Sequence, residues 1–163
     1  MSESASVGAG DFRRALALIQ HGERGDEAGM RVIIDDEVIP ADRLPQLIRA
    51  TVSIFWQLAA QTCEPYEVAE IGETLTQASA ADEVDLDRSN RLVARIAMAQ
   101  HSGNAGAEYE VLHEAASAPD GLVHLAVTTA GVVSALLPQL RTDAGRKLLN
   151  NLTMQAKSDE DRA

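Results

Sequence analysis

Apolar residues recur at helical spacing along most of the chain, and the clearest run lies in the middle of the first half. Asp42 is expected to cap this helix, with Pro45 in its first turn, where a missing N–H costs little. The stripe consists of Leu44, Leu47, Ile48, Thr51, Val52, Phe55, Leu58 and Ala59, with Ile54 and Trp56 on its flanks. A helix that is apolar over so much of its circumference is expected to pack against neighbours on several sides.

The same spacing predicts helices in the rest of the chain, about eight in total. They cover residues 12–21 (capped by Asp11), 30–38, 65–80, 91–101, 105–118, 122–137 and 143–156, the last capped by Thr142 or Asp143. The segment 31–34 alone resembles a strand. Because Met30, Ile33, Ile34 and Val38 lie at helical spacing, we expect a helix over 30–38, with the strand as the open alternative.

The second half of the chain echoes the first. Ala17, Gln20 and His21 recur eighty positions later as Ala97, Gln100 and His101. At an offset of seventy-eight, Asp42, Leu44, Leu47, Thr51, Leu58, Gln61, Gln77 and Ala78 recur as Asp120, Leu122, Leu125, Thr129, Leu136, Gln139, Gln155 and Ala156. Such a repeat predicts two tandem, weakly similar four-helix units, whether stacked or docked about a pseudo-two-fold axis.

These units span residues 11–81 and 91–157. A small, polar lead over residues 1–10 is expected to be flexible, and an acidic junction over residues 82–90 separates the units. The tail over residues 158–163 is polar and is expected to fray.

Composition supports an all-α fold with an aliphatic core, since 45% of the residues are hydrophobic but only 3% are aromatic. The net charge of −11 disfavours nucleic-acid binding, because a phosphate backbone would be repelled. Arginine greatly exceeds lysine, which is typical of a GC-rich genome such as that of an actinobacterium or its phage.

Nothing in the sequence indicates secretion or a membrane span. A single cysteine, Cys63, excludes an internal disulfide, and residues 1–11 lack the apolar run of a signal peptide. The longest uncharged stretch covers residues 122–137, which is shorter than the roughly 20 residues that span a bilayer. We therefore expect a soluble, cytoplasmic protein.

Catalytic and metal-binding motifs are incomplete. Glu110 and His113 have the spacing that brings a carboxylate and an imidazole to one metal in helical bundles, but this motif occurs only once. The zinc-protease pattern H-E-x-x-H, which would start at His113, is also incomplete because Ser117 stands in place of the second histidine. His21 and His101 are expected to bond free carbonyls at helix ends, and a symmetric pair lining a pocket is the alternative. We expect no catalytic residue and no cofactor, with Glu110 and His113 as weak metal candidates.

The leading hypothesis is a non-catalytic, acidic interaction module of the adaptor or inhibitor type, with a protein partner or a second copy of itself. The candidate interaction residues are Trp56, a natural interface anchor if exposed, and the acids Asp35, Asp36, Glu37, Glu64, Glu67, Glu70 and Glu73. The acids alone could form an ordinary solvated face. A small-molecule or metal-binding helical bundle is the first alternative, and a DNA mimic is the second.

Overall fold

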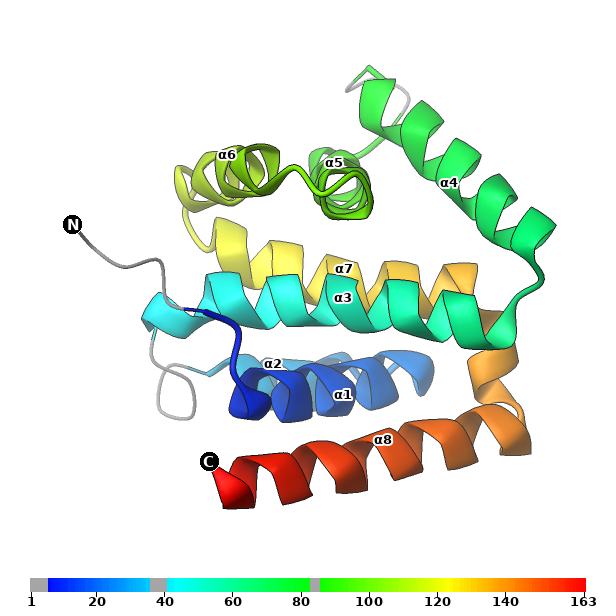
Figure 1. Ribbon diagram of the computed structural model, residues 1–163. Helices are drawn as coiled ribbons and strands as arrows, with labels where there is room; N and C mark the ends of the chain where they lie inside the picture. The colour runs from blue at the N-terminus through cyan, green and yellow to red at the C-terminus, as the bar shows by residue number, and fades with distance from the viewer. Residues whose placement is uncertain (1–5, 36–40, 83–85) are drawn as a thin grey trace.

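The computed structural model describes residues 6–35, 41–82 and 86–163, and every regular element in these ranges is a helix (Figure 1). The α-helices are α1 (Ala9–Glu23), α2 (Glu27–Ile34), α3 (Leu44–Thr62), α4 (Pro65–Ala80), α5 (Arg88–His101), α6 (Ala105–Ala116), α7 (Gly121–Leu136) and α8 (Asp143–Arg162). Two short 3₁₀ helices, η1 (Ala41–Arg43) and η2 (Pro138–Arg141), precede α3 and α8. The predicted all-α class is confirmed, and the ambiguous segment is helical up to Ile34; its remainder from residue 36 lies outside the described residues.

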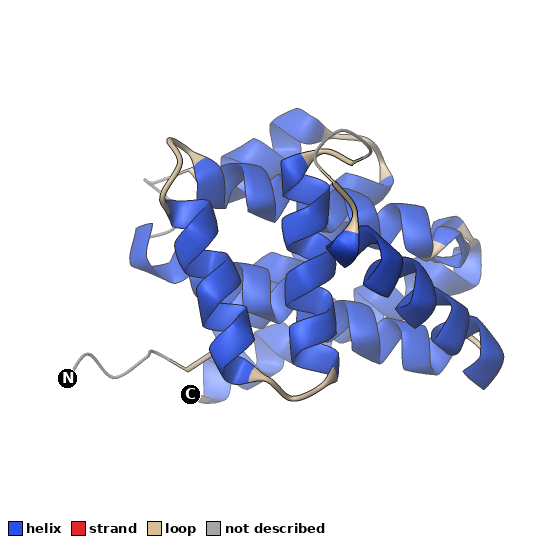
Figure 2. Cartoon of the chain, turned by 90° about the horizontal axis from the view of Figure 1, so that it is seen from above, coloured by secondary structure: helices blue, strands red, loops and turns tan. Residues whose placement is uncertain are grey.

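Helices α3 and α7 lie side by side in the middle of the molecule. Helices α1, α2 and α8 cover one side of this pair, and α4, α5 and α6 cover the other (Figures 1 and 2). Both α1 and α5 pack against α3 and α7, so that the first helix of each sequence half contacts the central helices of both halves.

The fourth helix of each half packs on the first helix of the other half. Helix α4 contacts mainly α5 and touches α3 only near their connection, whereas α8 contacts α1 and η2. The predicted division into two tandem units is therefore not confirmed, because each half completes its packing with a helix from the other. This reciprocal pattern is the one that docking about a pseudo-two-fold axis would produce.

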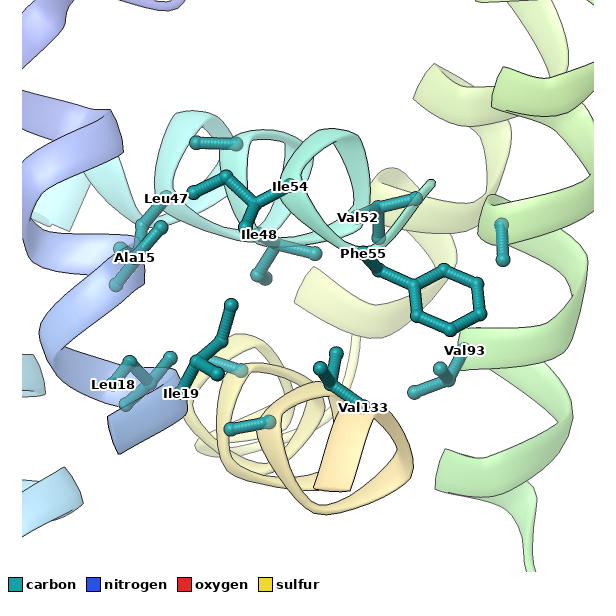
Figure 3. Packing of buried hydrophobic residues seen from close by; sticks show 14 of the residues in the cluster. Ala15, Leu18, Ile19, Leu47, Ile48, Val52, Ile54, Phe55, Val93 and Val133 are labelled. Atoms are coloured by element: carbon teal, nitrogen blue, oxygen red, sulfur yellow. The ribbon is translucent and has the colours of Figure 1, made fainter. Parts of the chain in front are cut away.

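One apolar core joins the two halves (Figure 3). Leu18 and Ile19 of α1 and Ile48 of α3 are completely buried, and they belong to the same cluster as Val93 of α5 and Val133 of α7. The cluster is almost entirely aliphatic, as the composition predicts, with Phe55 as its only buried aromatic ring among the described residues.

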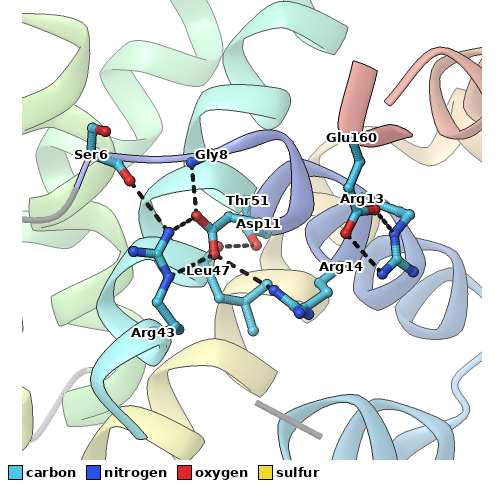
Figure 4. A network of polar contacts seen from close by, with 9 residues as sticks. All are labelled: Ser6, Gly8, Asp11, Arg13, Arg14, Arg43, Leu47, Thr51 and Glu160. Carbon is cyan, nitrogen blue, oxygen red and sulfur yellow. Dashed lines mark hydrogen bonds and ion pairs between the residues drawn. The ribbon is translucent and has the colours of Figure 1, made fainter. Parts of the chain in front are cut away.

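The start of α1 differs from the prediction, which placed Asp11 as the cap of a helix from Phe12. The helix begins at Ala9, with Gly8 as its N-cap, and the carboxylate of Asp11 accepts the Gly8 N–H at 2.8 Å. Asp11 is only 2% exposed and is ion-paired with Arg43 of η1, whose guanidinium also donates to the carbonyl of Ser6 at 3.3 Å (Figure 4). The acidic side chain therefore joins α1 to the start of α3 besides closing the first turn of α1.

Several other helix limits differ from the predicted ones; α2, for example, begins at Glu27 and not at Met30. Asp42 lies within η1 and does not cap α3, and α5 begins at Arg88, inside the predicted junction. Helix α8 continues to Arg162 and includes nearly all of the tail that was expected to fray. An ion pair between Glu160 and Arg13 attaches this end of α8 to α1, which explains why the polar residues remain helical.

Candidate functional site

Most of the acids that the sequence singles out lie on α4 or at its N-cap, and two of them form the capping box at its N-terminus. Pro65 occupies the first turn, where no backbone N–H is required, and Glu64 is the N-cap residue. The Glu64 N–H donates to the carboxylate of Glu67 at 2.7 Å, which is the return bond of a capping box. Glu67 therefore has a structural role in addition to its charge.

The two faces of α4 differ sharply. Val68, Ile71 and Leu75 point toward the core at helical spacing, but Leu75 is the only buried residue of the helix. Tyr66, Glu70 and Glu73 follow the spacing i, i+4, i+7, and all three are exposed. The outward face of α4, defined here by Tyr66, Glu70 and Glu73, thus combines an aromatic ring that is 65% exposed with two carboxylates.

This outward face is electrostatically uncompensated. Between residues 64 and 80 the chain has four glutamates and no lysine or arginine. Within the part of the chain that the structure describes, none of the four carboxylates takes part in an ion pair. The negative potential of α4 is therefore available to a basic group, and it is screened by salt because the carboxylates are largely exposed.

The structure does not bring the other predicted acids to this surface. Asp35 is exposed and directly follows α2. Helix α2 ends beside the start of α3, whereas α4 begins beyond the other end of α3 (Figure 1). The 19 residues of α3 separate these ends by about 28 Å at 1.5 Å per residue. Asp36 and Glu37 lie outside the described residues.

The side chain of Trp56 makes contacts within the protein. Its indole N–H donates to the carbonyl of Ala97 at 2.9 Å, and its ring stacks on His101 with a centroid distance of 4.3 Å. Both partners belong to α5, so the flank of α3 that carries Trp56 is covered by α5 and the side chain is partly buried. Trp56 joins α3 to α5 and is not part of the outward face of α4.

Replacement of Trp56 by phenylalanine tests this assignment. We expect a loss of about 2 kcal/mol in the free energy of unfolding, because the hydrogen bond is lost and a smaller ring fills the same space. Urea unfolding measures the change. Binding of a partner to α4 should be unaffected in the folded variant, and a selective loss of binding at unchanged stability would instead place Trp56 at the interface.

The two repeat-related histidines have different partners. The Nδ1 atom of His21 lies 2.9 Å from the carboxylate of Asp26, whereas His101 stacks on Trp56. The pKa of Asp26 is lowered by the hydrogen bond from the Gly29 N–H and by the bond to His21. The predicted bonds to free carbonyls are therefore not confirmed: His21 bonds the N-cap residue of α2, His101 packs against α3, and the two do not line a shared pocket.

The weak metal candidates Glu110 and His113 are both exposed on α6. Among the described residues, no three side chains of histidine, cysteine, aspartate or glutamate gather closely enough to hold a metal ion. These two residues therefore have no third ligand in the described chain. No single helix in the described ranges has both the length and the apolar character needed to cross a membrane.

Tyr66 is the residue of the outward face that the sequence interpretation overlooked. The signal was present, because Tyr66 precedes Glu70 and Glu73 by four and seven residues and therefore shares their face. Comparisons with protein-family models, curated proteins and solved structures found no significant match to this chain.

Proposed function

We propose that the protein is a non-catalytic interaction module that binds a basic protein segment through the outward face of α4. The observation that carries the proposal is an exposed tyrosine set among glutamates that have no ion-pair partner in the described structure. Tyrosine is enriched at the centres of protein interfaces, where its ring is buried and its hydroxyl bonds. The surrounding carboxylates would select a partner with lysine or arginine and accelerate its approach.

The chemistry of this face favours a protein over the other classes of partner. Nucleic acid would be repelled by four glutamates and by the net charge of −11. A small molecule needs a concave site, whereas α4 presents the convex side of a single helix that is packed on α5. A basic segment that lies along α4 would meet both the ring and the charges.

A pair of charge-reversal variants tests the proposal. The test variant is Glu70→Lys/Glu73→Lys, and the matched control is Asp159→Lys/Asp161→Lys on α8. The two variants have the same net charge. The control substitutions lie near the C-terminus of a helix, where cations are tolerated. Tagged wild type and both variants are used to capture partners from native lysate of the source organism. Each capture is repeated at about 1 M salt, where the Debye length falls to ~3 Å.

We expect one partner with a basic segment to be retained by the wild type and by the α8 control, and to be lost from the α4 variant and at high salt. Tyr66→Ala should weaken binding of this purified partner by about tenfold or more without a change in stability, because the ring is exposed in the free protein. Equal capture by the α4 variant and the wild type would refute the proposal, as would the absence of any specific partner.

A further inference from the structure

A second charged site lies where α1 ends and α8 begins, at the right of Figure 1. A cavity of about 160 Å³ is lined there by Gln20, Glu23, Arg24, Arg141, Arg146, Leu149 and Asn150. Leu149 is buried, and the Gln20 amide donates to Asn150 at 3.1 Å, so that α1 and α8 are joined across one wall. We call this cavity the arginine pocket.

The arginine pocket reverses the charge balance of the rest of the protein. Its three arginines come from three different elements: the C-cap of α1, the end of η2 and the first turns of α8. Three guanidinium charges and the single carboxylate of Glu23 leave a local charge of +2, in a chain whose net charge is −11. All three arginines are exposed to solvent, and such a concentration of like charge favours the binding of an anion.

The anion is not supplied by the described residues. None of the three arginines forms an ion pair with a described carboxylate, although Arg141 is oriented by a 3.0 Å bond to the hydroxyl of Ser134 on α7. Within the described structure, the Oε1 atom of Glu23 has neither solvent contact nor a hydrogen-bond partner. The carboxylate present in the pocket therefore does not pair with the guanidinium groups around it.

The charged lining is also specific to one half of the repeat. At the offsets of eighty and seventy-eight, the pocket residues correspond to Gln100, Gly103, Asn104, Cys63, Val68, Ile71 and Gly72. Only the glutamine is retained, and none of the counterparts is charged. The arginines are therefore not required by the packing plan that the two halves share.

We propose that the arginine pocket binds a phosphate monoester or free phosphate. A guanidinium group bonds phosphate oxygens in a bidentate manner, and the dianion matches the local charge of +2 with Glu23 ionised. The cavity is smaller than a typical pocket for a whole small molecule, which suits a single phosphoryl group with the remainder of an ester extending into solvent. Recognition would be independent of α4, which packs on the other side of the molecule.

The test is a titration of the full-length, ¹⁵N-labelled protein with inorganic phosphate at constant ionic strength, with chloride as the balancing anion. We expect saturable amide shifts confined to residues 20–24 and 141–150. Arg146→Gln should raise the dissociation constant for phosphate by about tenfold or more, since a charged hydrogen-bond pair is lost. Arg31→Gln on α2, which removes the same charge outside the pocket, should bind like the wild type.

For a second pair of variants, we expect a change in phosphate affinity of the opposite sign. Glu23→Gln removes the only negative charge of the pocket and should tighten phosphate binding several-fold, whereas Glu27→Gln on the exposed face of α2 should leave it unchanged. Burial raises the pKa of Glu23 against the opposing effects of Arg146, Arg141 and Arg24, in keeping with a carboxylate that lacks a close partner.

The absence of shifts beyond those caused by chloride would overturn the proposal, and so would equal phosphate binding by wild type and Arg146→Gln. Titration with glycerol phosphate then distinguishes a phosphate monoester from free phosphate as the ligand. A dissociation constant at least tenfold lower than that of inorganic phosphate would identify an ester as the ligand, and equal constants would identify phosphate itself.

Discussion

Gly145→Ala is expected to destabilise the protein by about 3 kcal/mol or more. A Cβ atom at this position would lie 2.4 Å from the carbonyl oxygen of Gln139 and 2.5 Å from the Cα of Leu140. Both are backbone atoms of η2, so no side-chain rotation relieves the overlap. The start of α8 would have to move away from η2, and the contact between α8 and α1 would be weakened.

Gly131→Ala is the matched control for this substitution. Gly131 is an exposed residue inside α7, and a Cβ there would meet no atom within 4 Å. Alanine should stabilise the protein by roughly 0.5–1 kcal/mol at such a helical position, because the unfolded chain loses freedom. Urea unfolding of the two variants should give changes of opposite sign, and a Gly145→Ala variant as stable as wild type would show that α8 does not pack closely on η2.

Asp11→Ala is expected to cost about 3 kcal/mol, the lower end of the range for breaking a buried ion pair. The carboxylate is 2% exposed and receives bonds from Arg43 and from the Gly8 N–H, with Arg14 at 3.9 Å. Alanine leaves these donors without their acceptor and opens the first turn of α1. The cost stays at the lower end because the Arg43 side chain is 26% exposed and can be partly solvated.

A double-mutant cycle separates the ion pair from the cap. Arg43→Met in the Asp11→Ala background removes the second, uncompensated charge, and should recover part of the lost stability. Asp161→Ala at the exposed end of α8 controls for the loss of one negative charge and should change the free energy of unfolding by less than about 0.5 kcal/mol. Additive effects of the two substitutions in the cycle would exclude a direct coupling between Asp11 and Arg43.

Helix existence followed from the sequence because the apolar stripes repeat at 3.6 residues. The Met30–Ile34 segment, for which the sequence left a strand open, is helical, as its spacing indicated. Helix limits were less predictable. Asp11 has the chemistry of a cap, but its carboxylate serves better at the third position, where it reaches both Gly8 and Arg43. The continuation of α8 depends on the distant partner Arg13, which no local pattern reveals.

The pairing of helices could not be read from the repeat. The repeat relates each helix to its counterpart in the other half but does not show which helices pack against each other. It therefore could not predict that α4 packs on α5 and α8 on α1, each in the other half. Trp56 shows the same limit, since the sequence placed it on a flank of α3 without showing that α5 covers the flank. The acids of α4 were found by their spacing, and the same spacing places Tyr66 on the face of Glu70 and Glu73, although the sequence interpretation did not use it.

Helix α4 packs mainly on α5, and Leu75 is its only buried residue. Because so little of its surface is buried, we expect α4 to separate from α5 at a free energy below that of global unfolding. The apparent affinity of a partner that recognises only the docked helix is reduced by the fraction of molecules in which α4 is undocked. A residue on the hidden side of α4 therefore contributes to binding strength without touching the partner, and changes in temperature or denaturant will reach the interaction through this local equilibrium first.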